Sequence, residues 1–242
     1  MQTFFIFIAV LVSESVLALV FPERHDALSF TDGVGNEYVK RTGCPPTTVS
    51  LATQLVRLQT SIQVLQEPDY FLTGSGFPTA SEWTSTVLAT LLIDYSQASN
   101  DSQYFPNFIA VFNNESVVEL IFQGNDDILW VCLACLRGAA YASINYPQWV
   151  PTLLDRAKLF YTLASRGWDN TTCGGGMVSG PFSTYKNAVT NELWITASVG
   201  MYEAFGEPTM LEAALQAWTW FNNSGMINAQ GLVNDGLSGN CT

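Results

Sequence analysis

Histidine is almost absent from the sequence. The single one, His25, lies near the N-terminus and far from any segment with residues suited to catalysis. The sequence therefore argues against a Ser-His-Asp triad, a histidine that acts as acid or base, and a histidine-rich metal site. We predict no metal and no cofactor, and carboxylates become the main candidates for chemistry.

Basic residues are also scarce, with 9 Lys plus Arg against 21 Asp plus Glu and a formal net charge of −12. Binding to nucleic acid or to an anionic membrane surface requires Lys and Arg to neutralise phosphates, so we expect neither partner. All charged residues together make up only 12% of the chain. We therefore expect other groups, such as glycans, to keep the protein in solution.

Long hydrophobic runs are missing except at the N-terminus. Residues 4–12 form a short apolar run, and Val16-Leu17-Ala18 fits a small-residue cleavage site. This pattern predicts a secretory signal peptide at residues 1–18. Ser13 and Glu14 end the run well short of a bilayer span, and no later stretch reads as long and apolar enough, so we expect no membrane anchor. Residues 19–44 are then an N-terminal extension before one domain at 45–242, and we expect a monomer.

Secretion is supported independently by N-x-Ser/Thr sequons, which are acceptors of N-linked glycans in secreted proteins. Together with the signal peptide they predict a glycosylated protein that is extracellular or in the cell wall. The acceptors are Asn100, Asn114, Asn170, Asn222 and Asn240.

Cysteine is limited to five residues, so in an oxidising compartment at least one is unpaired within the chain. Cys132 and Cys135 form a C-x-x-C motif that could indicate redox or zinc chemistry. The motif falls inside an apolar helical pattern with no local histidine, which favours buried small residues instead. We predict that Cys173 and Cys241 form a disulfide that ties down a loop.

Strand signals are scarce, and helical periodicity dominates residues 45–242, which predicts an all-α fold. The segments 127–143 and 187–205 are apolar nearly all round, whereas 152–166 and 208–222 are amphipathic. A helix that is apolar all round is buried, and an amphipathic one faces solvent. The alternation predicts helical hairpins arranged as an inner and an outer ring. Further helices are predicted at 47–66 and 81–97, while 107–122 is ambiguous between helix and extended structure.

Two adjacent carboxylates, Asp126 and Asp127, lie immediately before the apolar helix at 127–143. Carboxylates forced together with apolar residues behind them can have their pKa values driven apart. One ionised and one protonated carboxyl group is what glycoside hydrolysis needs. The alternative is that both residues only cap the helix and complement its dipole.

A glycine run at 174–176 precedes a polar cluster at the start of the helix at 187–205. Glycines permit positive φ and close approach of the backbone to a ligand, although a flexible connector is the simpler alternative. Amides, a phenol and an ammonium group at one mouth suit sugar hydroxyls, although Asn187 also suits a helix cap. The candidate sugar-binding residues are Gly174, Gly175, Gly176, Tyr185, Lys186, Asn187 and Asn191.

Five blocks of the sequence resemble glycoside hydrolase family 76, the endo-α-1,6-mannanases and related fungal wall proteins. They are Asn-Asp-Asp at 125–127 with Trp130, Gly-Trp-Asp at 167–169, Thr-Cys-Gly-Gly-Gly at 172–176, Thr-Tyr-Lys-Asn-Ala-Val-Thr-Asn-Glu-Leu at 184–193, and the glycine- and asparagine-rich stretch 225–237. The resemblance implies an (α/α)6 toroid of helical hairpins. Because the chain stops at Thr242 where family members continue, we expect the toroid to be incomplete.

The resemblance also implies a retaining mechanism with Asp126 as nucleophile and Asp127 as general acid/base, and Trp130 beside the substrate. We therefore predict a secreted glycosidase that acts on α-1,6-mannan or another mannose-containing glycan, with transglycosylation in the cell wall as a variant. One alternative is a non-catalytic carbohydrate-binding or cell-wall protein that keeps the Asp pair only as a cap. Another is a truncated gene product with no stable function of its own.

Overall fold

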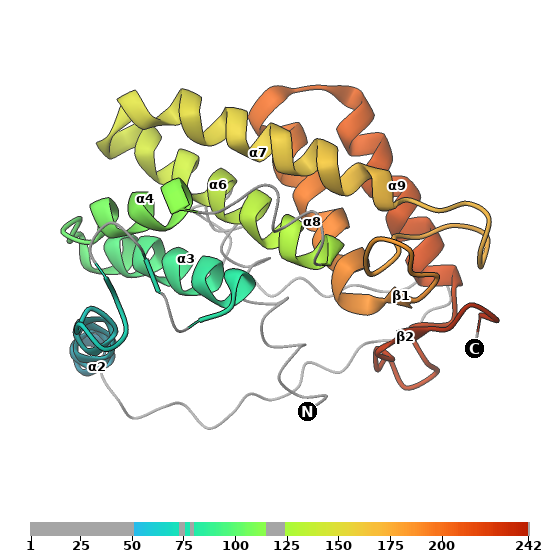
Figure 1. Cartoon of the computed structure of the whole chain (residues 1–242), viewed down its shortest axis with the longest axis horizontal. Helices are drawn as coiled ribbons and strands as arrows, with labels where there is room; N and C mark the ends of the chain where they lie inside the picture. The colour runs from blue at the N-terminus through green and yellow to red at the C-terminus, as the bar shows by residue number, and fades with distance from the viewer. Residues whose placement is uncertain (1–50, 73–75, 78–79, 115–123, 242) are drawn as a thin grey trace.

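The computed structural model describes residues 51–241 apart from 73–75, 78–79 and 115–123 (Figure 1). The predicted signal peptide, the extension at 19–44 and the domain boundary at 45 lie outside the described residues. Within them are seven α-helices, two 3-10 turns and one two-stranded sheet. The helices are α2 (Leu51–Leu65), α3 (Glu82–Ser99), α4 (Phe105–Asn114), α6 (Asn125–Asn145), α7 (Val150–Ala164), α8 (Ala188–Phe205) and α9 (Pro208–Asn223); the turns are η1 (Pro147–Trp149) and η2 (Ser165–Gly167); the strands are β1 (Lys186–Asn187) and β2 (Gly236–Leu237).

The predicted all-α class is confirmed, and each predicted helix is present with small differences at its ends. The ambiguous segment at 107–122 is helical as α4 to Asn114, and its remainder, 115–122, lies outside the described residues. The short sheet was not predicted. It pairs Lys186 with Leu237 and Asn187 with Gly236 in antiparallel register, and so joins the start of α8 to a segment about fifty residues later.

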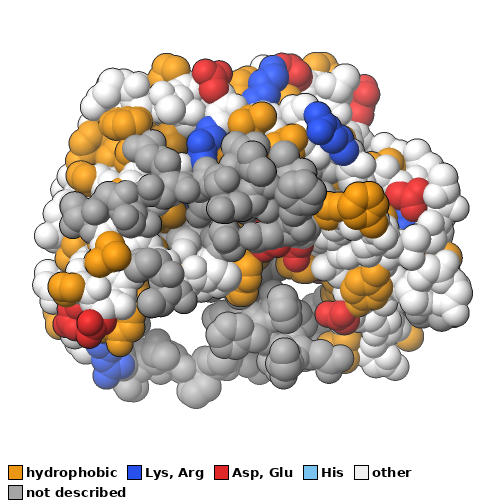
Figure 2. Space-filling model, in the orientation of Figure 1, with side chains coloured by type: hydrophobic (Ala, Val, Ile, Leu, Met, Phe, Trp, Pro, Cys, Tyr) orange, Lys and Arg blue, Asp and Glu red, His pale blue; other side chains and the backbone are white. Residues whose placement is uncertain are grey.

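Helix α6 is the central element, in contact with α3, α7 and α8, and α8 in turn packs against α9 (Figure 1). The outer helices bury one stripe each at helical spacing. In α7 the stripe is Leu153, Ala157, Phe160, Tyr161 and Ala164, and in α9 it is Met210, Ala214, Ala217 and Phe221. This arrangement agrees with the inner and outer positions that the hydrophobic pattern predicts. Figure 2 shows only scattered charged side chains on one face of the molecule, as the composition implies.

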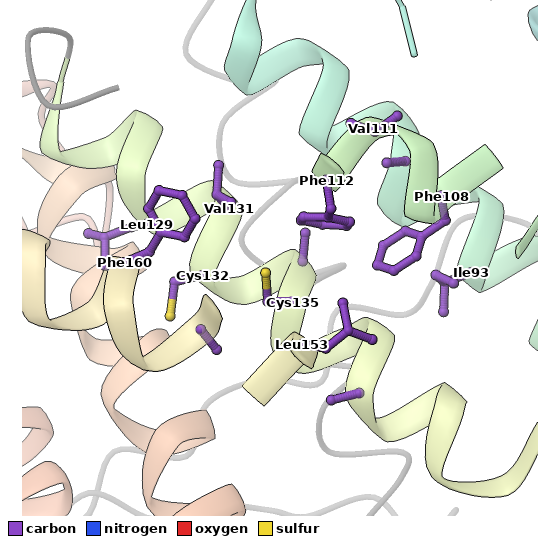
Figure 3. Packing of buried hydrophobic residues seen from close by; sticks show 14 of the residues in the cluster. Ile93, Phe108, Val111, Phe112, Leu129, Val131, Cys132, Cys135, Leu153 and Phe160 are labelled. Atoms are coloured by element: carbon purple, nitrogen blue, oxygen red, sulfur yellow. The ribbon is translucent and has the colours of Figure 1, made fainter. Parts of the chain in front are cut away.

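The core around α6 explains the C-x-x-C motif (Figure 3). Within the described residues neither Cys132 nor Cys135 forms a disulfide, and both are fully buried among apolar side chains that include Phe108, Leu153 and Phe160. Burial raises the pKa of the Cys132 thiol far above its usual range, so the thiolate needed for redox or metal chemistry is disfavoured. The motif is part of the core.

By length and composition alone, α6 could cross a membrane, so the expectation that no later stretch would qualify is wrong for this helix. However, α6 is buried between α3, α7 and α8, and an apolar core helix meets the same criterion. Its only basic side chain, Arg137, forms an ion pair with Asp94 of α3, with 2.7 Å between Nη2 and Oδ1.

Candidate functional site

The adjacent carboxylates lie in the first turn of α6, whose N-cap is Gly124. The Gly124 N–H donates to Oδ2 of Asp127 at 2.8 Å. The capping role that competes with catalysis is therefore present for Asp127. A Cβ on residue 124 would overlap the carboxylate of Asp126 in its present position, so glycine here lets both acid side chains lie against the start of the helix.

The carboxyl group of Asp126 has a pKa raised from 3.8 to about 6. Partial burial is the larger cause, and the negative charge of Asp127 is the second. Backbone N–H groups of the helix start oppose the shift without cancelling it. Asp126 thus gains or loses its proton at a mildly acidic pH. The sequence predicts such a shifted pKa for two adjacent carboxylates with apolar residues behind them.

Asn125 anchors this turn to the rest of the molecule. Its backbone N–H donates to the carbonyl oxygen of Ser179, and its Nδ2 donates to that of Val178, each at 2.8 Å. The side chain is buried, and a Cβ on Gly167 would overlap it. The segment 177–179 therefore fixes the position of the catalytic candidates. The sequence places Asn125 beside them but gives no sign of this contact.

The same segment is fixed from the start of α8 by Asn191, which is fully buried. Its Oδ1 accepts the N–H of Met177 at 2.8 Å, while its Nδ2 donates to the carbonyl oxygens of Met177 at 3.0 Å and Asn187 at 2.9 Å. Both ends of the amide are thus engaged inside the protein. Asn191 thus holds the start of α8 to the segment 177–179, which in turn bonds to Asn125 at the start of α6, and its predicted contact with sugar stays a prediction.

Lys186 is also fully buried, under the loop that contains the glycine run. Its Nζ donates to the carbonyl oxygens of Asp169 at 2.7 Å and Gly176 at 3.1 Å, and lies 3.1 Å from Oδ2 of Asp169. Burial lowers the pKa of the ammonium group, and the Asp169 carboxylate opposes that shift. The structure thus places the Lys186 ammonium group under the loop, where it bonds to the backbone, and its predicted contact with sugar stays a prediction.

The glycine run makes room for Trp220 of α9. A Cβ on Gly175 would lie 2.8 Å from Cδ1 of Trp220, and one on Gly176 would overlap the six-membered ring, while both residues have positive φ. The Trp220 Nε1–H donates to the carbonyl oxygen of Cys173 at 2.9 Å. Packing therefore requires glycine at both positions, and the predicted approach of their backbone to a ligand stays a prediction. Beside them, Gly174 also has positive φ but faces open space.

The loop is tied to the C-terminal segment as well. The structure joins Cys173 to Cys241, the predicted pair, with 5.4 Å between their Cα atoms. Tyr185 donates its hydroxyl to the carboxylate of Asp235. Burial and then this carboxylate raise the pKa of Tyr185 to about 12. The 235–241 region thus reinforces the start of α8.

The remaining candidates are placed as follows. Trp130 lies one turn after Asp126 on the same face of α6 and is partly buried against the core. Asn187 occupies the N-cap position of α8, but its side chain makes no capping bond, and among the described residues its Oδ1 is buried without a hydrogen-bond partner. Both stay predicted substrate contacts.

The exposure of the predicted glycosylation sites can be read from the structure. Asn100, Asn170, Asn222 and Asn240 are exposed, while the side chain of Asn114 is not described. Glycan attachment at these sites stays a prediction. Within the described ranges, no group of three or more His, Cys, Asp or Glu side chains could hold a metal ion.

Comparison with known proteins identifies the family. The sequence profile of glycosyl hydrolase family 76 matches residues 59–242. The chain belongs to this family. The mannan endo-1,6-α-mannosidase DFG5 of Saccharomyces cerevisiae is 32% identical over 162 residues, which cover 61% of this chain and 32% of that protein. Its relative DCW1 from the same yeast is 28% identical over 155 residues, covering 60% and 32%. The family 76 chain therefore spans about a third of the length of these curated relatives.

Solved structures agree on the fold. An inactive variant of the α-1,6-mannanase of a Salegentibacter species, in complex with α-1,6-mannotriose, superposes with a TM-score of 0.65 at 20% identity, covering 76% of this chain and 56% of that one. Dfg5 from Chaetomium thermophilum, in complex with glucosamine, gives 0.65 at 19% identity, covering 78% and 52%. The described helices thus correspond to part of a helical toroid. A D-mannose isomerase also superposes, at 0.57, so the fold alone does not determine the reaction.

Proposed function

We propose that this family 76 chain is a secreted glycoside hydrolase that cleaves α-1,6-mannan through Asp126 and Asp127. The observation that carries the proposal is the carboxylate pair in the first turn of α6, where the charge of Asp127 helps to raise the pKa of Asp126 to about 6. The role given to each acid is the one that the family resemblance implies, and does not follow from this pKa. The inactive Salegentibacter mannanase has two consecutive aspartates replaced by asparagine, which supports the same assignment. Secretion rests on the leader pattern at residues 1–18 and on the sequons.

In the proposed reaction, Asp126 attacks the anomeric carbon while Asp127 gives its proton to the leaving glycosidic oxygen. The resulting glycosyl-enzyme is then attacked by water, from which Asp127 takes a proton. Two displacements at one carbon retain its configuration. If a sugar hydroxyl group replaces water, the same intermediate transfers mannan to another chain, which would serve cell-wall assembly.

The stereochemical outcome tests the mechanism directly. Linear α-1,6-mannotetraose is incubated with the protein, and the first reducing end formed is followed by NMR. We expect the α-anomer to appear first and to mutarotate afterwards. With an excess of α-1,6-mannobiose as acceptor, we expect longer products from transfer. Initial release of the β-anomer would contradict the retaining mechanism.

The pH dependence tests the role of Asp126. A nucleophile must be ionised, so we expect kcat/KM to fall below a pH of about 6 as Asp126 takes up a proton. In Asp127→Asn the neighbouring charge is lost, so this limb should move to lower pH; an aryl α-mannoside with a good leaving group keeps that variant measurable. A rate that instead falls as the pH rises through about 6 would make Asp126 the acid.

Carbohydrate binding without catalysis is the second candidate, and the Gly124–Asp127 capping bond favours it. A binding protein would be retained on a mannan affinity gel and release no sugar. Its retention would survive replacement of both aspartates, whereas the proposed enzyme loses its turnover.

A further inference from the structure

Phe182 is completely exposed, at 104% of its reference accessibility, at the tip of the short loop between Ser179 and Tyr185. Its φ is +63°, in the left-handed region that a bulky side chain rarely adopts. A large aromatic ring in water gains nothing for the fold, and strained backbone of this kind tends to occur at functional positions.

The loop that carries the ring is internally braced. The N–H of Ser179 donates to the carbonyl oxygen of Tyr185 at 2.8 Å, which closes the base of the loop, and the N–H of Ser183 donates to Gly180 at 3.2 Å. The Ser183 hydroxyl accepts from the Ser179 hydroxyl at 3.0 Å and from the N–H of Tyr185 at 3.1 Å. The ring is therefore presented from a fixed base, so that binding costs little conformational entropy.

The base of this loop is bonded to the start of α6, the helix that carries Asp126 and Asp127. The carbonyl oxygen of Ser179 accepts the N–H of Asn125, the residue before Asp126, at 2.8 Å. Three peptide links separate the Cα atoms of Ser179 and Phe182, so these lie at most about 11 Å apart. A short run of linked pyranose rings can span the distance between the carboxylates and the Phe182 side chain.

We propose that Phe182 is a stacking platform for a mannose ring of the α-1,6-mannan chain, outside the site of bond cleavage. The proposal rests on the proposed function and adds to it a residue that sets preference for longer chains. A phenyl ring offers no hydrogen bond, so its contribution is burial of the apolar C–H face of the pyranose against the aromatic face. A fixed platform suits the flexible α-1,6 linkage because it orders a chain that is otherwise mobile.

Calorimetric titration of the Asp126→Asn protein with α-1,6-mannotriose and α-1,6-mannohexaose tests the proposal. Adding Phe182→Ala should weaken binding of the hexaose about tenfold, or about 1.4 kcal/mol, and affect the triose less. Phe182→Trp should restore binding. In the otherwise unaltered protein, Phe182→Ala should raise KM for mannan with little change in kcat.

Ile144→Ala is the matched control, since Ile144 is 79% exposed on the same helix as Asp126 but about 27 Å further along it. It should change neither Kd. Equal hexaose affinity in the Phe182→Ala protein and its parent would overturn the platform, while mannan cleavage by the unaltered chain would leave the proposed function standing. If the unaltered chain neither binds nor cleaves mannan, the proposed function fails and the platform fails with it.

Discussion

Replacement of Asp126 or Asp127 by asparagine is expected to abolish cleavage of α-1,6-mannan while the helical fold persists. Asparagine has nearly the same shape as aspartate but can neither attack the anomeric carbon nor transfer a proton. We expect kcat to fall by at least about 10³-fold in each variant. Reducing-sugar release from linear mannan, with circular dichroism on the same samples, is the measurement. Full activity in either variant would contradict the assignment.

The two variants should fail at different steps. Asp127→Asn keeps the nucleophile, so a substrate with a good leaving group should still form the glycosyl-enzyme, and azide should then release an α-mannosyl azide. Asp126→Asn lacks the nucleophile, and azide attacking from its side should give the β-azide instead. The configuration of the azide product therefore assigns the two roles independently of the pH profile.

The stability of these variants provides a control with a definite sign. The folded-state pKa of Asp126 is raised from 3.8 to about 6, so ionisation of this group opposes folding and the protein loses stability as pH rises through that window. Asp126→Asn should therefore be more stable at pH 7, on the order of 1–3 kcal/mol, and equal to the parent below about pH 4. In Asp127→Asn the amide oxygen can still accept the Gly124 N–H, and loss of the charge that helps to raise the Asp126 pKa should give a smaller gain in stability at pH 7 than Asp126→Asn does.

The helices were predictable because burial leaves a local periodic pattern. The apolar circumference of α6 and the single stripes of α7 and α9 are visible within each segment, so type and order follow from the sequence. The β1–β2 pairing was not predictable, because two-residue strands have no period of their own. That pairing depends on contact between residues that are about fifty positions apart.

For the site, sequence reasoning found residue types but not their surroundings. The pair Asp126 and Asp127 was identified from its adjacency before an apolar helix and from the family resemblance, and the alternative of helix capping is visible in the Gly124 bond. The packing of Trp220 of α9 on Gly175 and Gly176 was not predictable, because nothing local in the sequence indicates it. Contacts across tens of residues decide whether a polar or flexible position faces a substrate or supports the segment that does.

Lys186→Met is expected to lower the free energy of unfolding by about 3–5 kcal/mol. The fully buried ammonium group bonds to two carbonyl oxygens and to the carboxylate of Asp169, and lies 5.8 Å from the ring centre of Trp220. Methionine fills similar space but leaves these oxygens without their donor. Asp169 keeps its bonds to Thr171, and its side chain is 22% exposed, so we expect the lower end of the range.

The matched control is Lys158→Met, which removes an ion pair with Glu207 of similar length, 2.9 Å, but with both side chains about half exposed. Exposed pairs contribute less than about 1 kcal/mol, so urea unfolding with the disulfide intact should separate the two variants clearly. Equal losses would show that the buried ammonium group does not hold the loop. Because Gly176 leads into the segment 177–179 that anchors Asn125, Lys186→Met should also lower kcat in protein that remains folded, whereas Lys158→Met should not.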